Sequence, residues 1–181
     1  MSKNVLKTAV VGKNFVGKSS LCNAISGRTI DNEYTSTIGI DYIVKHNIGN
    51  KSLGFWDLTG LERFGTITAS YIRRSHVVLF CYSATDFVTY TKMVEKYLLY
   101  KKLKYLKNKR IVIVVTKIDS KYAISDYDKW PKDFLKETGY PFVKTSSYKK
   151  IGLNEVVKAC LGKDDDIQIK DDIQIKDNID Y

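Results

Sequence analysis

Residues Gly12 to Ser19 form a motif that can bind a phosphate chain. The segment Gly12-Lys13-Asn14-Phe15-Val16-Gly17-Lys18-Ser19 fits the pattern G-x-x-x-x-G-K-[ST] without a mismatch. In such a loop the glycines let backbone N–H groups approach phosphate oxygens. The lysine reaches the β- and γ-phosphates, and the serine hydroxyl can ligate Mg²⁺. The alternative is a chance match of a glycine-containing loop. The apolar run before it and the helical pattern after it argue against chance, because a helix N-terminus would then face the anion.

Apolar runs that alternate with helical patterns must position this loop. Six strands are predicted at residues 5–11, 40–48, 53–57, 77–82, 111–116 and 142–145. Five helices are predicted at residues 18–26, 65–75, 88–106, 126–137 and 153–161. Gly49-Asn50 predicts a tight turn, so the second and third strands should form an antiparallel hairpin.

The remaining strands need crossover helices and should run parallel. The expected fold is therefore α/β, with a six-stranded, mostly parallel sheet, one antiparallel edge strand and five helices on both faces. Ligands of such sheets bind beyond the carboxyl ends of the strands. The phosphate-binding loop, Asp57, Thr116 and Thr145 are all expected at such ends.

Composition indicates one folded domain with no membrane span. The chain has 181 residues, of which 44% are hydrophobic, and no apolar run approaches the ~20 residues that a span needs. The three cysteines, Cys22, Cys81 and Cys160, are odd in number and widely spaced. They predict reduced thiols in a cytosolic compartment.

Charge divides the chain into a basic body and an acidic tail. The net charge is +10, but residues 163–181 contain seven Asp and three Lys, so the tail carries −4 and residues 1–162 carry +14. The tail contains the repeat Asp-Asp-Ile-Gln-Ile-Lys twice and has little to bury, which predicts disorder. Alternatively, its isoleucines at period two could add a strand to a sheet edge.

The densest basic cluster lies where the third predicted helix ends. It contains Lys101, Lys102, Lys104, Lys107, Lys109 and Arg110. Such residues suit a helix C-terminus and solvent, and the alternative is a functional patch for an anionic partner. Both interpretations remain open. The chain has no aromatic RNA-binding platform or groove-reading motif, so we expect no nucleic-acid partner.

Five motifs in order, between Lys7 and about Leu161, resemble those of the Rab branch of Ras-type small GTPases. Besides the phosphate-binding loop they are Tyr34–Tyr42, Asp57 with Gly60, Thr116-Lys117-Ile118-Asp119 and Thr145-Ser146-Ser147. The Rab resemblance rests on Ile38–Tyr42, Glu62-Arg63-Phe64 and Tyr71-Ile72-Arg73. The resemblance implies that residues 1–162 form a phosphate-loop G domain, expected to be a monomeric switch that binds GTP or GDP with Mg²⁺.

The resemblance also implies a role for each site residue. Ser19, Thr37 and, through a water, Asp57 would hold Mg²⁺. The catalytic group would comprise Lys18, Thr37, Gly60 and Leu61. Asp119 would accept two hydrogen bonds from guanine, the backbone N–H of Ser147 would meet its O6, and the Lys117 stem would pack against the base. The full expected nucleotide-contacting set is Asn14, Phe15, Val16, Gly17, Lys18, Ser19, Ser20, Ile30, Tyr34, Thr37, Gly60, Thr116, Lys117, Asp119, Ser146, Ser147 and Tyr148.

Leu61 departs from the family pattern at the hydrolytic position. The family has a glutamine there that orients the attacking water, and a leucine has no group that can do so. Intrinsic hydrolysis should be slow even for a class whose unaided rates are about 10⁻⁴ to 10⁻² s⁻¹. Activating proteins of Rab relatives can insert their own glutamine, so two hypotheses remain. The chain is either a slow switch that recruits effectors in its GTP state or a GTP-locked binding module that does not cycle.

Other departures concern the hydrolytic site, the base and the membrane anchor. Thr59 would put a hydroxyl near the γ-phosphate; the alternative is a tolerated exchange of one small residue for another. Ile30 stands where the family often has an aromatic residue that stacks against guanine. No prenylation motif ends the sequence, so membrane contact would be indirect or need an anchor absent from this sequence. We expect a cytoplasmic protein, peripheral on intracellular membranes. Its exchange factor, activating protein and effectors would bind through residues 34–42 and 60–74.

Overall fold

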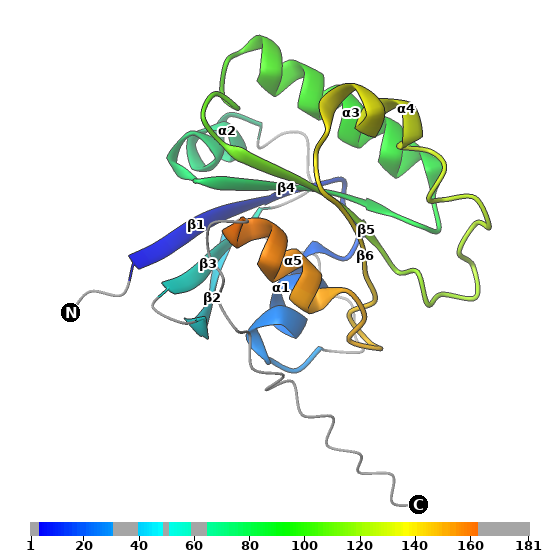
Figure 1. Cartoon of the computed structure of the whole chain (residues 1–181), viewed down its shortest axis with the longest axis horizontal. Coiled ribbons are helices and arrows are strands. Elements are labelled where there is room, and N and C mark those ends of the chain that lie inside the picture. The colour runs from blue at the N-terminus through cyan, green and yellow to red at the C-terminus, as the bar shows by residue number, and fades with distance from the viewer. Residues whose placement is uncertain (1–3, 31–39, 49–50, 59–64, 163–181) are drawn as a thin grey trace, which may run out of the picture.

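A six-stranded sheet forms the centre of the computed structural model, which describes residues 4–30, 40–48, 51–58 and 65–162 (Figure 1). The strand order is β2-β3-β1-β4-β5-β6. The strands are β1 (Asn4–Val11), β2 (Ile40–Ile48), β3 (Lys51–Leu58), β4 (Val77–Ser83), β5 (Arg110–Thr116) and β6 (Phe142–Lys144). All neighbouring strands pair in parallel except β2 and β3. The predicted sheet is therefore confirmed.

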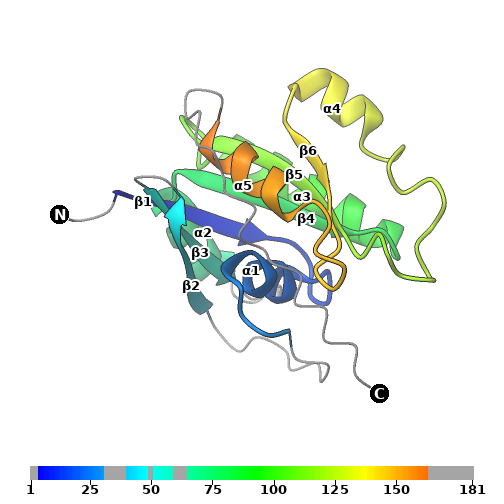
Figure 2. The same cartoon turned by 60° about the horizontal axis from the view of Figure 1, so that its bottom comes forward.

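Helices cover both faces of the sheet (Figures 1 and 2). They are α1 (Lys18–Ser26), α2 (Gly65–Arg74), α3 (Phe87–Lys102), α4 (Lys132–Thr138) and α5 (Leu153–Leu161). Side chains of α1 and α5 pack into one core cluster, and side chains of α2, α3 and α4 pack into the other. The two clusters lie on opposite faces of the sheet, as expected for a doubly wound α/β fold.

The central strands supply both cores by simple alternation. Along β4, Leu79 and Cys81 belong to the α1/α5 cluster, whereas Val78, Phe80 and Tyr82 belong to the other. Successive side chains of a strand point to opposite faces. A strand covered by helices on both faces is therefore apolar throughout, and every residue of β4 is buried.

The hairpin prediction is confirmed by the antiparallel register of β2 and β3, in which Tyr42 lies opposite Trp56 and Val44 opposite Gly54. The ladder shifts register between Lys45 and Ile48. The predicted turn residues, 49 and 50, lie outside the described part of the chain.

Two predicted helices are too long. The helix expected at 126–137 is wrong in its first half: residues Asp126 to Trp130 form turns, and α4 begins after Pro131. A proline disfavours helical backbone in the residue before it, which explains the late start. The helix expected at 88–106 stops at Lys102, and Lys104 takes φ 59° in the turns that follow. The helices at 18–26 and 153–161 match their predictions.

Cys22, Cys81 and Cys160 are free and buried. Among the residues described, no helix combines the length and apolar character needed to cross a bilayer. The acidic tail lies beyond the described range, so its predicted disorder stays a prediction.

Candidate functional site

The loop between β1 and α1 is built around two glycines with different tasks. Gly12 lies against β4, where a Cβ would stand 2.6 Å from the carbonyl oxygen of Cys81. Gly17 has φ 93° and caps the N-terminus of α1. A side chain would collide at the first position and strain the backbone at the second. The first turn of α1 contains no acidic residue, so its N-terminus keeps the partial positive charge that favours an anion.

Lys18 is a buried cation in the first turn of α1. Only 7% of its surface is exposed, and its Nζ donates to the carbonyl oxygen of Lys13, 3.1 Å away. Burial lowers the pKa of Lys18 from its ordinary value, and the negative charge of Asp57 opposes this shift. Asp57 is itself 1% exposed and belongs to β3. A buried cation at an anion-accepting loop can serve a phosphate chain better than a solvated lysine, because the lower local dielectric strengthens its field.

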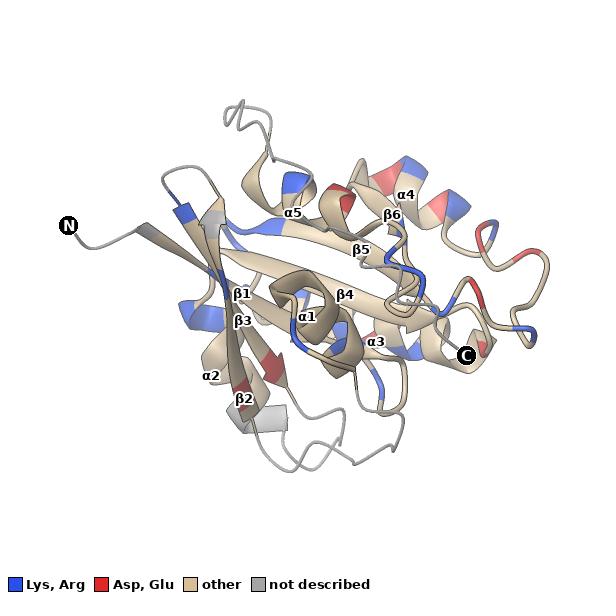
Figure 3. Cartoon of the chain, turned by 90° about the horizontal axis from the view of Figure 1, so that it is seen from below, with Lys and Arg blue, Asp and Glu red and all other residues tan. Residues whose placement is uncertain are grey.

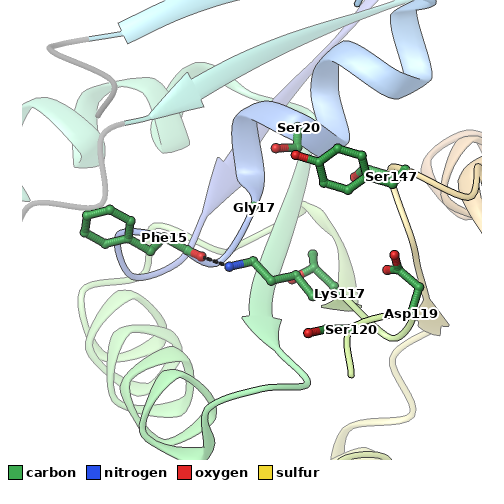
Figure 4. A pocket seen from close by; sticks show the side chains of 9 residues that line it. Phe15, Gly17, Ser20, Lys117, Asp119, Ser120 and Ser147 are labelled. Atoms are coloured by element: carbon green, nitrogen blue, oxygen red, sulfur yellow. Dashed lines mark hydrogen bonds between the residues drawn. The ribbon is translucent and has the colours of Figure 1, made fainter. Parts of the chain in front are cut away.

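The loop after β5 is fastened to the phosphate-binding loop. The Thr116 hydroxyl donates to the carbonyl oxygen of Val16 and lies 3.1 Å from that of Tyr82. The Lys117 Nζ donates to the carbonyl oxygen of Phe15 at 2.5 Å (Figure 4). Both Phe15 and Lys117 have positive φ, 66° and 60°, a conformation that costs energy outside glycine. Burial lowers the pKa of Lys117, and the carboxylate of Asp86 opposes that change.

The loop after β6 is held beside the loop after β5. Thr145 donates from both its backbone N and its hydroxyl to the carbonyl oxygen of Val115, at 2.8 and 2.9 Å. The backbone N–H of Ile118 donates to the carbonyl oxygen of Thr145 at 3.3 Å. Ser146 and Ile151 then exchange two backbone hydrogen bonds, and this pairing sets where Ser147 lies.

These three loops enclose a cavity of about 360 Å³. Its lining residues are Phe15, Gly17, Ser20, Thr116, Lys117, Asp119, Ser120, Ser147 and Tyr148 (Figure 4). All but one were predicted as nucleotide contacts. Ser120 was missed, although its place directly after Asp119 in the same turn was a usable signal. Because one carboxylate, one lysine side chain and several hydroxyls line this cavity, it can hold a flat polar ring by hydrogen bonds.

Several predicted residues lie elsewhere. Val16 and Ser146 are fully buried and support the loops from behind. Ile30 is half-buried and lines a neighbouring cavity of about 500 Å³ that it shares with Ser147 and Tyr148. Asn14 and Ser19 belong to the phosphate-binding loop without lining the first cavity. Tyr34, Thr37, Gly60 and Leu61, together with Thr59, fall outside the described residues.

Three aromatic side chains, from β2, β3 and α2, pack against one another near the sheet edge that β2 forms. The ring centroids of Tyr42 and Trp56 are 4.2 Å apart, and those of Trp56 and Tyr71 are 4.7 Å apart. The Tyr42 ring lies across Gly54, where a Cβ would stand 2.1 Å from the phenolic oxygen. Tyr42 and Tyr71 lay within the predicted partner regions, but Trp56 did not. No sequence signal pairs it with Tyr42, because the register shift between Lys45 and Ile48 changes which hairpin residues lie opposite each other.

The fold and this site define a phosphate-loop α/β domain with a ring-sized cavity at the carboxyl ends of its strands. The Ras family model matches residues 7–164. GTP-binding protein YPT1 of Saccharomyces cerevisiae is 35% identical over 153 residues, which cover 79% of this chain and 70% of that protein. Ras-related protein RABC1 of Arabidopsis thaliana is 31% identical over 156 residues, 83% of this chain and 73% of the relative.

A shorter match links the chain to Ras-related protein Rab-18-B of Danio rerio, 42% identical over 91 residues, or 49% of this chain and 44% of that protein. The chain therefore belongs to the Ras family, and it is a Rab-like small GTPase with a phosphate-loop G domain.

Proposed function

We propose that this chain is a guanine-nucleotide switch that binds GTP and GDP with Mg²⁺ and hydrolyses GTP slowly on its own. The observation that carries the proposal is the cavity between the phosphate-binding loop and the loops after β5 and β6. It brings Lys117, Asp119 and Ser147 to one wall, close to the loop that contains the buried Lys18. Ras-family GTPases bind guanine nucleotides, and Mg²⁺ typically accompanies them.

Each group then has a chemical task. Backbone N–H groups of the phosphate-binding loop and the Lys18 ammonium hold the phosphates. Ser19, Thr37 and, through a water, Asp57 supply oxygen ligands of the kind that Mg²⁺ prefers. The Asp119 carboxylate accepts two hydrogen bonds from guanine, which adenine cannot offer, and the Ser147 N–H donates to guanine O6. Thr116 and Lys117 keep the base-binding loop fastened to the phosphate-binding loop.

Leu61 makes hydrolysis slow. Water attack on the γ-phosphoryl group needs a residue that orients the water, and the leucine side chain carries no hydrogen-bonding group. Lys18 and the Gly60 N–H still stabilise charge on the phosphate oxygens. A residual rate in the range of about 10⁻⁴ s⁻¹ or below is therefore expected.

The nucleotide state is read by partners. Rab-like GTPases generally interact with exchange factors, activating proteins and effectors. Here we assign those contacts to residues 34–42 and 60–74, which include Tyr42 and Tyr71 of the packed aromatic group Tyr42, Trp56 and Tyr71. Aromatic side chains dominate the energy of many interfaces, so this aromatic group suits effector recruitment in the GTP state. The accompanying role is in vesicle trafficking, at the cytoplasmic face of intracellular membranes.

Single-turnover GTP hydrolysis by Leu61→Gln tests the proposal. We expect measurably faster hydrolysis than in the wild type, because the amide can align the attacking water. Leu61→Met is the matched control, since it keeps the apolar volume and should stay slow. Adding Thr59→Ala to Leu61→Gln shows whether the threonine hydroxyl crowds the same water. A wild type that already turns over as fast as Leu61→Gln would contradict the role given to Leu61.

Leu61 also supports a second candidate function, a GTP-locked binding module. Nucleotide extracted from freshly purified protein, followed over hours, separates the two. A switch shows bound GTP converting slowly to GDP. A locked module keeps GTP throughout, and Leu61→Gln does not release it.

A further inference from the structure

The end of α3 and the turns after it expose leucine and lysine side chains together. Leu98, Leu99 and Leu103 keep 55%, 51% and 45% of their surface exposed. Single exposed leucines are normal on a protein surface, but three within one and a half helical turns form a patch. The exposed lysines among and after them are Lys101, Lys102, Lys104 and Lys107. We call these seven residues the Lys–Leu patch.

The patch lies in a strongly positive region. The sequence has no Asp or Glu from Lys96 to Ile118, and no ion pair found among the described residues involves a patch lysine. The neighbouring end of α2 adds positive charge. The Lys109 Nζ donates to the carbonyl oxygens of Arg73 at 3.0 Å and Ser75 at 2.6 Å, and the Arg73 guanidinium lies 5.1 Å from the Tyr105 ring centroid.

The region around α4 differs, because acidic and basic residues alternate along it (Figure 3). There Lys144 pairs with Asp128 at 3.5 Å. The positive charge of the Lys–Leu patch is therefore a local feature, which the overall basicity of the domain does not explain.

The chain leaves the described domain at the same pole as the patch. Gly162 lies against Arg110, so closely that a Cβ would stand 2.3 Å from Nη2. Arg110 Nη1 also donates to the carbonyl oxygen of Cys160 at 2.6 Å. Arg110 opens β5 directly after the lysine-rich turns. This pole is opposite the carboxyl ends of the strands, where the cavity lies.

The segment that follows Gly162 is complementary to the patch in both charge and apolarity. Residues 163–181 contain seven Asp and five Ile, and two copies of the repeat Asp-Asp-Ile-Gln-Ile-Lys. Aspartates can pair with the lysines while isoleucines cover the leucines. At about 3.3 Å per extended residue, this segment is long enough to reach any part of that pole.

We propose that residues 163–181 bind the Lys–Leu patch of the same chain. Exposed ion pairs are individually weak, but attachment to the same chain gives an effective concentration that can reach millimolar values. The bound segment covers the leucines and offsets the positive charge in the free protein. An acidic partner or an anionic surface must displace the segment before it can reach the patch.

A spin label on the tail of the full chain tests this. All three native cysteines are buried, so a nitroxide reagent reacts selectively with Asn178→Cys. In the GDP-loaded protein, amide NMR signals of residues 98–107 should lose most of their intensity, whereas those of residues 129–137 should keep theirs. Raising the ionic strength from about 0.01 M to about 0.15 M shortens the Debye length from about 30 Å to about 8 Å and should restore part of the signal.

Charge reversal supplies the matched controls. Lys101→Glu, Lys102→Glu, Lys104→Glu and Lys107→Glu together should abolish the intensity loss. The same four-charge reversal at the exposed Lys121, Lys129, Lys132 and Lys136 should leave it intact. Reversing Asp165, Asp166, Asp171 and Asp172 to lysine in the first variant should bring the loss back. Leu98→Ser with Leu103→Ser should weaken it without changing the charge.

Three results would overturn the proposal. The first is an intensity loss spread evenly over the surface. The second is an equal reduction of the intensity loss by the reversal of the four patch lysines and by the reversal of the four control lysines. The third is binding of phosphatidylserine vesicles through the four patch lysines while the label leaves residues 98–107 undisturbed, because the patch would then be a membrane surface.

Discussion

Individual residues of the site sit in conformations that only the assembled loops explain. Phe15 has φ 66° although it is not a glycine, and its carbonyl oxygen accepts the Lys117 ammonium at 2.5 Å. Strained backbone of this kind persists where surrounding contacts over-determine it. Here the contact comes from the loop after β5. The Lys117–Phe15 hydrogen bond therefore both joins the two loops and holds Phe15 in its strained conformation. Asp119 lines the same cavity from the next turn.

At Asp119 we predict that Asp119→Asn shifts preference from guanine towards xanthine nucleotides. An amide cannot accept both guanine hydrogen bonds, but its N–H₂ can donate to the 2-oxo group of xanthine. Competition binding of GDP and XDP measures the change. Asp126→Asn removes a carboxylate from a turn beyond the cavity and should change nothing. Wild-type protein that binds ATP as well as GTP would contradict the assignment of this loop.

At Ile30 we predict faster spontaneous nucleotide release than in relatives with an aromatic residue there. Ile30 lines the cavity next to the proposed base site, together with Ser147 and Tyr148. Ile30→Phe should slow release by about threefold to tenfold if the ring contributes about 1 kcal/mol. Stopped-flow release of a fluorescent GDP analogue measures this, with Ile30→Leu as the ringless control. Unchanged or faster release would show that another side chain already covers the base.

Among the elements, β5 has two tasks. It is a buried strand between β4 and β6, and its last residue, Thr116, fastens the phosphate-binding loop. The Thr116 side chain is 2% exposed and contacts the carbonyl oxygens of Val16 and Tyr82. Buried carbonyl groups that lose a donor are costly, because no water replaces it.

We therefore predict that Thr116→Val lowers the free energy of unfolding by about 1–3 kcal/mol and also speeds nucleotide release. Urea unfolding and nucleotide dissociation kinetics measure the two effects. Thr138→Val removes a comparable hydroxyl-to-backbone hydrogen bond within α4, 2.8 Å long. It should lower stability without affecting release. Equal nucleotide dissociation rates in the two variants would show that the Thr116–Val16 contact does not hold the phosphate-binding loop.

For the whole molecule, the site connects segments that are far apart in the chain. The phosphate-binding loop, the loop after β5 and the loop after β6 all line one cavity. A ligand bound there stabilises the folded state through all three. The melting temperature of the whole domain should therefore depend on whether nucleotide is bound.

We predict that protein stripped of nucleotide with EDTA melts at a lower temperature and recovers when Mg²⁺ and GDP return. Ligand at about 100 times Kd adds about 2.7 kcal/mol, which corresponds to a rise of about 5–10 °C in Tm for a domain of this size. ATP should give no rise. Ser19→Asn should reduce the Mg²⁺-dependent part of this rise, because the proposed metal ligand is lost. The same rise in Ser19→Asn as in the wild type would count against Ser19 as that ligand.

The order of the elements, the mostly parallel sheet and most of the residues that line the cavity could be predicted from the sequence alone. Local signals were sufficient for these: continuous apolar runs in strands covered on both faces, helical spacing, and motifs at strand ends. They failed at Pro131, where the restriction on the preceding residue delays the start of α4 to Lys132. Boundaries depend on such single competing residues, whereas the type of a long periodic element does not.

The contacts between distant residues, in contrast, depend on the tertiary arrangement of the strands and loops. No local pattern pairs Lys117 with the carbonyl oxygen of Phe15, which is 102 positions away, or puts Trp56 between Tyr42 and Tyr71. The same is true of Ile30, which the structure puts in the neighbouring cavity, and of Gly162 against Arg110. The physical reason is that strand order and register bring distant loops to one edge of the sheet. Hydrophobic periodicity specifies which face of an element is buried but not which other element covers it.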